Sequence, residues 1–191
     1  MKIAIVYAHP SAESFNHSLL EAFKSGIKEA GHEADVIDLY ADGFDPVLTF
    51  SEQGSSKELV VSYQEKIKEA DHLAFIFPTW WYRPPAILEG FLDQVFSQGF
   101  AFKYLPSLFG FIPRVKGLLP VKKIIVMETY GGPSWYYRYL ICQLPWKRLR
   151  LVFRFCGVRK FLHVPCYAIR PSNKSLKAYL ERAKKIGRKL K

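Results

Sequence analysis

The chain has 191 residues, 49% of them hydrophobic and 16% aromatic, so it is long and apolar enough for one domain with a sizeable core, and disorder is excluded. Its net charge of +11 is uneven: residues 1–102 carry 7 basic and 15 acidic side chains, whereas residues 103–191 carry 21 and 2. The basic half indicates a surface that attracts anions, either a nicotinamide dinucleotide, an acidic partner, a membrane surface, nucleic acid, or solvent ions alone.

No segment of the sequence is typical of secretion or of membrane insertion. Apolar runs are shorter than a membrane span, and the opening residues lack the apolar region and cleavage site of a signal peptide. Cys142, Cys156 and Cys166 are odd in number and lack C-x-x-C spacing, which argues against a disulfide framework and a zinc site. We therefore expect a cytoplasmic protein with free thiols and no metal.

Apolar runs alternate with helical periods along the whole chain. Five strands are predicted at residues 2–7, 34–39, 72–78, 122–129 and 160–169. Helices are predicted at 16–30, ending at Gly31, and at 58–70, 85–96, 134–154 with a break at Pro145, and 172–191 with Ser172 as N-cap. Residues 104–120 fit neither period and are predicted as an irregular apolar loop. The pattern is that of a single α/β domain, residues 1–191, with a parallel sheet.

Ligands of open parallel sheets bind beyond the carboxyl ends of the strands, so three loops are the candidate site. After the first, third and fourth strands stand "AHPSAESFN", "PTWWYRPP" and "TYGGPSWYY". Neither a G-x-G-x-x-G fingerprint nor a P-loop is present. We call these segments the first, second and third loops and expect them to converge.

Each loop offers one kind of contact, and each has an ordinary structural alternative. The first leads into a helix N-terminus, whose free N–H groups suit a phosphate, or it is a plain capped loop. The aromatic residues of the second could stack on a flat ring or pack together. The glycines of the third allow close backbone approach, a positive φ, or simply a turn.

Together the motifs resemble those of the NAD(P)H:quinone oxidoreductases of DT-diaphorase type. The matching segments are "AHPSAESFN", "FPTWWYRPPAILEGFLDQVFSQGFAF", "TYGGPSWYY" and "FRFCGVRKF", in the order of that family. The resemblance implies a flavodoxin-like three-layer sandwich with a five-stranded parallel sheet in the order 2-1-3-4-5. It also implies a homodimer with the site at the interface, in which residues 104–120 would be an interface or lid element.

The resemblance further implies a flavin site built from all three loops. The residues matched to the phosphate contacts are His9, Ser14, Phe15 and Asn16. Those matched to the loop under the isoalloxazine ring are Pro78, Thr79, Trp80, Trp81 and Tyr82, and those along its pyrimidine edge are Thr129, Tyr130, Gly131 and Gly132. Tyr137 matches a tyrosine thought to stabilise charge on the reduced flavin, and Gln143 stands where mammalian members have a histidine.

The implied cofactor is FAD, with FMN as the alternative. NAD(P)H would pass a hydride to the flavin, and a quinone or another flat electrophile would then take it, in a ping-pong sequence. Two rival readings share the fold: a flavodoxin-type electron carrier, and an ancillary regulatory flavoprotein that docks on a membrane potassium-efflux system through "KRLRLVFRFCGVRK" and "RAKKIGRKLK". Nucleic-acid binding is not expected, because no recognised motif accompanies the basic residues.

Overall fold

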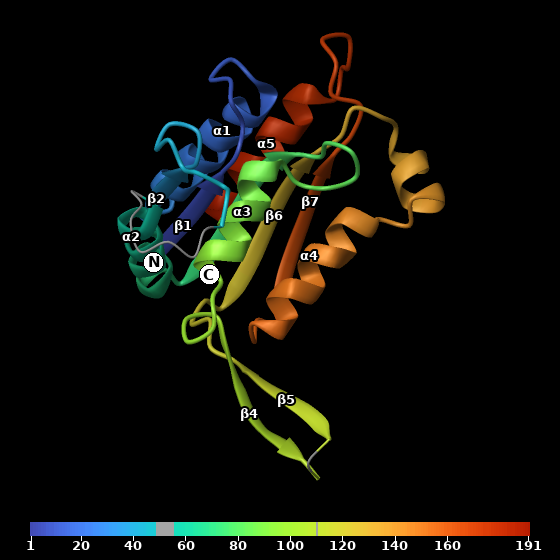
Figure 1. The fold of residues 1–191 in the computed structure, drawn as a ribbon. Helices are drawn as coiled ribbons and strands as arrows, with labels where there is room; N and C mark the ends of the chain where they lie inside the picture. Colours follow the sequence, from blue (N-terminus) through green and yellow to red (C-terminus); the bar gives the residue numbers. More distant parts are fainter. Residues whose placement is uncertain (49–55, 110) are drawn as a thin grey trace.

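A five-stranded parallel sheet forms the centre of the computed structural model, which describes residues 1–48, 56–109 and 111–191 (Figure 1). Its strands are β1 (Lys2–Tyr7), β2 (Glu33–Asp38), β3 (His72–Pro78), β6 (Lys123–Thr129) and β7 (Lys160–Cys166). They lie in the order β2-β1-β3-β6-β7, and all neighbouring pairs are parallel. This is the expected order 2-1-3-4-5, because β4 and β5 lie outside this sheet.

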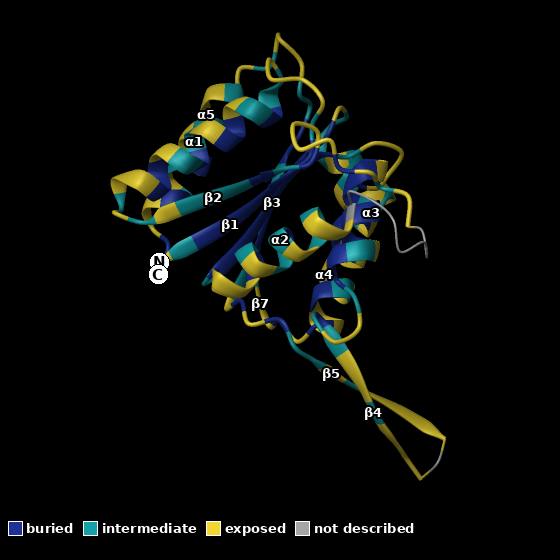
Figure 2. Cartoon of the chain, turned by 60° about the vertical axis from the view of Figure 1, so that its left-hand side comes forward, coloured by how far each residue is buried: buried dark blue, intermediate teal, exposed yellow. Residues whose placement is uncertain are grey.

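Helices cover both faces of the sheet and make a three-layer sandwich (Figure 2). α1 (Phe15–Glu29) and α5 (Leu176–Arg188) lie on one face, and α2 (Ser56–Glu69), α3 (Ala86–Val95) and α4 (Leu144–Phe155) lie on the other. In β1, Ile3 and Ile5 pack with α1 and α5, whereas Ala4 and Val6 face the opposite layer. Strands buried on both faces read as continuous apolar runs, which is why the sequence revealed them.

Both ends of α1 follow the local capping rules, whereas the start of α5 differs from the prediction. Ser14 caps α1 by accepting a hydrogen bond from the His17 N–H, and α1 stops before Gly31, whose φ is 71°. The predicted cap at Ser172 is wrong, because α5 begins at Leu176 after a turn. No helix among the described residues has the length and apolarity that crossing a bilayer requires.

The prediction of an irregular loop at residues 104–120 is wrong. β4 (Phe102–Leu108) and β5 (Ile112–Gly117) pair as an antiparallel hairpin that projects from the body of the molecule (Figure 1). Pro106 lies where the register shifts, at an irregularity that tolerates a missing N–H. Most residues of the hairpin are exposed, so the sequence carries no buried period there to indicate a strand.

The segment predicted as a helix at 134–154 divides near the expected point. A single π-helical turn, η1 (Tyr136–Leu140), is followed by Cys142 and Gln143, which both have a positive φ. Pro145 then lies in the first turn of α4, where its missing N–H removes no helical hydrogen bond. The proline therefore starts a helix rather than kinking one.

Candidate functional site

The three loops meet at the carboxyl edge of the sheet, around Thr129. The Asn16 Nδ2 donates to Thr129 Oγ1 at 3.0 Å, and both side chains are buried. The Thr79 N–H donates to the Thr129 carbonyl oxygen at 2.8 Å. One residue at the end of β6 thus joins the first and second loops to the third.

The first loop presents free N–H groups to an anion. No hydrogen bond between described residues uses the N–H of Phe15 or Asn16 at the start of α1, and the first turn carries no acidic residue. The Phe15 ring packs against Tyr179 of α5, with ring centroids 6.4 Å apart, so only its backbone faces the site edge. The His9 Nδ1 accepts from the Ser11 N–H at 3.0 Å, and partial burial lowers the pKa of His9, which favours the neutral imidazole.

The second loop is a tight aromatic turn. Pro78 ends β3, and Trp80 and Arg83 then exchange two backbone hydrogen bonds at 2.9 and 3.1 Å. Trp81 and Tyr82, between them, have φ values of 51° and 61°, a conformation that costs free energy in bulky residues. Trp81 is 88% exposed, so packing inside this chain does not explain its aromatic side chain.

The third loop leaves open space at one glycine and is crowded at the other. Among the described residues, apart from its chain neighbours, a Cβ at Gly131 would meet no atom within 4 Å, whereas one at Gly132 would lie 3.1 Å from Tyr137 Cε2. Neither glycine has a positive φ, so the pair serves close approach and not a left-handed turn. Tyr130 is buried, and its ring packs against the rings of Tyr137 and Tyr167, with centroids 4.3 and 5.1 Å away.

Tyr137 and Gln143 are linked through the backbone. The Gln143 N–H donates to the Tyr137 carbonyl oxygen at 2.8 Å. Burial, assisted by the nearby phenol of Tyr82, raises the pKa of Tyr137. The hydroxyl therefore remains a hydrogen-bond donor at working pH. The hydroxyls of Tyr82 and Tyr136 lie 2.6 Å apart and connect the second loop to η1.

Two polar residues that the sequence reasoning missed lie next to each other below these loops, one near the end of β6 and one in the middle of β7. Glu128 of β6 is fully buried; its carboxylate accepts from Thr79 Oγ1 at 2.6 Å and lies 3.1 Å from His163 Nε2 of β7. The sequence feature that could have indicated Glu128 was a glutamate inside the apolar run "KKIIVMET". It was overlooked because its partners are distant in sequence.

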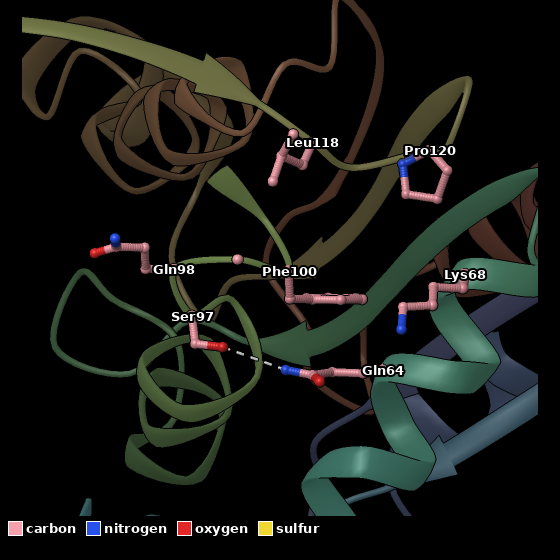
Figure 3. Close-up of a pocket in the computed structure, with 8 residues that line it drawn as sticks. Gln64, Lys68, Ser97, Gln98, Phe100, Leu118 and Pro120 are labelled. Atoms are coloured by element: carbon pink, nitrogen blue, oxygen red, sulfur yellow. Dashed lines mark hydrogen bonds between the residues drawn. The ribbon is translucent and has the colours of Figure 1, made fainter. Parts of the chain in front are cut away.

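A separate hollow lies at the other end of the sheet (Figure 3). Its volume is about 540 Å³, and its walls come from α2, the segment after α3 and the segment before β6. The side chains drawn include Gln64, Lys68, Ser97, Phe100 and Leu118, and the Gln64 amide donates to Ser97. None of the predicted site residues lines it, and it adjoins the amino ends of β3 and β6. In the described part of the chain no His, Cys, Asp and Glu cluster is placed to bind a metal.

Comparison with known protein families shows which family the chain belongs to. The Flavodoxin_2 family model, described as a flavodoxin-like fold, matches residues 1–190. The chain belongs to this family.

Individual members of the family show which class of enzyme the chain resembles. Ribosyldihydronicotinamide dehydrogenase (quinone) of Pongo abelii is 31% identical over 189 residues, covering 83% of this chain and 78% of that protein. NAD(P)H dehydrogenase (quinone) 1 of Cavia porcellus is 33% identical over 70% of this chain, which spans about half, 54%, of that relative. The NAD(P)H:quinone oxidoreductase structure from Methanothermobacter marburgensis has a TM-score of 0.87 at 30% identity, covering 100% of this chain and 99% of that one. The predicted resemblance is confirmed, and the chain is an oxidoreductase.

Proposed function

We propose that this oxidoreductase binds a flavin and uses NAD(P)H to reduce quinones or related flat electrophiles by two electrons. The observation that carries the proposal is the meeting of all three loops at Thr129, through the Asn16 and Thr79 contacts. Relatives of about 30% identity are named for the dehydrogenation of reduced nicotinamides with a quinone, which supports this substrate class.

The residues at the edge fit a flavin. The free N–H groups of Phe15 and Asn16 and the positive end of the α1 dipole suit its phosphate. The open space at Gly131 lets a flat ring approach the backbone, and the exposed aromatic turn at Trp80 and Trp81 offers a stacking surface. FAD is the proposed cofactor, because the helix start at Ser14, Phe15 and Asn16 resembles that of the FAD-binding members of the family. FMN is the alternative, because the phosphate contacts are common to both.

The overall reaction balances as NAD(P)H, a proton and a quinone giving NAD(P)⁺ and a hydroquinone. A bound flavin supplies the chemistry of accepting a hydride from one substrate and delivering it to the other. The chain supplies orientation: the second loop would hold the flat ring of the cofactor by stacking, and Tyr137 offers a protonated hydroxyl to developing negative charge. Because donor and acceptor would occupy the same face in turn, the kinetics are ping-pong.

A homodimer with shared sites is the proposed assembly. The β4–β5 hairpin has only two strands, which are marginally stable without cover, and its tip exposes Phe109 and Phe111 at 78% and 76%. A second copy would bury such surfaces, and sedimentation of the wild type against Phe109→Ser/Phe111→Ser tests this assembly.

The deciding experiment is steady-state oxidation of NADH and NADPH by the flavin-loaded protein with a soluble quinone as acceptor. N-ribosyldihydronicotinamide belongs in the donor panel, because the Pongo relative is named for it. Turnover with parallel double-reciprocal lines supports the enzyme and its ping-pong order. A flavin-loaded protein that exchanges electrons only when a separate reductase is added would instead be an electron carrier.

Docking on a membrane potassium-efflux system is the second candidate, favoured by the exposed face of α4. Lys147, Arg150 and Arg154 are exposed there beside Leu151, which is 68% exposed. Co-sedimentation with vesicles that contain the efflux system, compared with matched empty vesicles at high salt, separates specific docking from charge attraction. Equal sedimentation with both kinds of vesicle would reject it.

A further inference from the structure

Glu128 is a buried carboxylate in a basic half of the chain. It is the only acidic residue between Asp93 and Glu181, and its exposure is 0%. A carboxylate taken out of water costs free energy unless donors or a counter-charge compensate it. Its position at the carboxyl end of β6, directly before Thr129, places it under the candidate site.

The carboxylate holds the start of the second loop. Thr79 Oγ1 donates to Glu128 Oε1 at 2.6 Å, a length typical of a hydroxyl bound to a charged acceptor. The Thr79 N–H donates to the carbonyl oxygen of Thr129 at 2.8 Å. Two consecutive residues of β6 therefore fix both the side chain and the backbone of Thr79, and with them the direction in which the aromatic turn leaves the sheet.

The second carboxylate oxygen faces His163 on the neighbouring strand. His163 Nε2 lies 3.1 Å from Glu128 Oε2, and the His163 side chain is 11% exposed. Its ring stacks on Trp146 of α4, with centroids 4.5 Å apart and an interplanar angle of 11°. Histidine is a side chain that proteins commonly use to transfer protons.

The tyrosines around the Glu128–His163 pair stay neutral. Burial is the main cause that raises the pKa of Tyr130, and the nearby charge of Glu128 adds to it, so this phenol stays neutral. Burial also raises the pKa values of Tyr137 and Tyr167. Arg150 of α4 lies over the ring of Phe161 on β7. Among the described side chains packed around this end of β6 and β7, Glu128 and His163 form the carboxylate–imidazole pair.

We propose that the Glu128–His163 pair sets the redox potential of the bound cofactor, with His163 taking up a proton as the cofactor is reduced. The inference rests on the proposed flavin binding. A hydride brings two electrons and one proton to the site, which leaves added negative charge above a carboxylate. A second proton, from solvent, then converts the neutral imidazole to imidazolium and cancels that charge; reoxidation returns it. By linkage, reduction raises the proton affinity of His163, and Glu128 acts as a positioning residue for the second loop.

Three variants separate charge from shape. Glu128→Gln keeps the size and one acceptor for Thr79 but removes the charge. Thr79→Val removes the hydroxyl and keeps the charge. His163→Gln can still donate to Glu128 but cannot hold an extra proton. Flavin-loaded proteins are titrated with a redox dye from pH 5.5 to 8.5 to obtain the midpoint potential, and flavin dissociation constants are measured by fluorescence.

The expected results differ for each variant. Glu128→Gln raises the midpoint potential by about 30 mV. For two electrons, this shift corresponds to roughly a tenfold change in the ratio of the affinities for oxidised and reduced flavin. Thr79→Val weakens flavin binding and leaves the potential unchanged. His163→Gln takes up fewer protons per two electrons than the wild type within this pH range.

Each negative result of these experiments leads to a different conclusion. If the wild type binds flavin and both Glu128→Gln and His163→Gln keep its potential and its pH dependence, the pair has no redox role and the inference is overturned. If Glu128→Gln does not fold, the pH dependence of His163→Gln alone decides. If the folded wild type binds neither FAD nor FMN, the proposed function fails first.

Discussion

The strained aromatic turn makes a prediction about stability and activity together. Replacing Trp81 and Tyr82 by Asn and Gly installs the pair preferred where both central residues of a two-residue turn have a positive φ. The two strained residues cost about 2–4 kcal/mol together. The loss of the Tyr82–Tyr136 hydrogen bond offsets about 1 kcal/mol of the relief.

The double variant should therefore be more stable than the wild type by about 1–3 kcal/mol. For a domain of this size, each kcal/mol raises the melting temperature by roughly 2–4 °C. Trp81 is 88% exposed, so little burial is lost with it. Quinone reduction should fall at least tenfold, because the stacking surface of the second loop is removed.

The assay is thermal unfolding by circular dichroism at equal flavin content, followed by steady-state reduction of a quinone. Tyr139→Asn is the matched control, because Tyr139 is 75% exposed and has no positive φ. This control should change stability by less than about 0.5 kcal/mol. A double variant that melts below the wild type would refute the assignment of strain. A stabilised variant with full activity would show that the turn is not part of the site.

Three further predictions concern single residues and pH. Gly131→Val should leave the melting temperature of the cofactor-free chain unchanged, because its Cβ meets no protein atom, yet reduce flavin retention at least tenfold; full retention argues against the placement. Tyr137→Phe should slow hydride transfer about tenfold and change flavin affinity less than threefold, measured by stopped flow, whereas an unaltered rate removes Tyr137 from the mechanism. Burial raises the pKa of Cys166 to about 12 and also raises the pKa of Tyr130. The stability that these two neutral groups contribute to the fold is complete below pH 9 and is lost as the pH rises through their folded-state pKa values. Melting curves from pH 8 to 12 check this decline.

The sheet and its two covered faces could be predicted because burial leaves a pattern in the sequence. The strands from Ile3 to Val6 and from Ile124 to Met127 are apolar on both faces, so their positions are readable without a structure. The rule that ligands bind at the carboxyl ends of strands then selects three loops, and the structure brings these loops together at Thr129. The hairpin at 102–117 was missed because exposure of both its faces removes that pattern.

Individual side chains of the candidate site were less predictable than its loops. The Phe15 ring packs on α5 because helix geometry turns it away from the loop edge, which no local sequence pattern reveals. Glu128 depends on His163, 35 residues away, and on Thr79, 49 residues away, so its role appears only when the strands are placed side by side. Backbone strain at Trp81 and Tyr82 likewise comes from the surrounding fold, since neither residue favours a positive φ.

The most direct test of flavin binding is the visible absorption spectrum of the purified protein, with chromatography of whatever small molecule heat releases. We expect the two absorption bands of an oxidised flavin, one FAD or FMN per chain, and loss of the longer-wavelength band when NADH or NADPH is added without oxygen. A folded protein that is colourless and takes up neither flavin would contradict it.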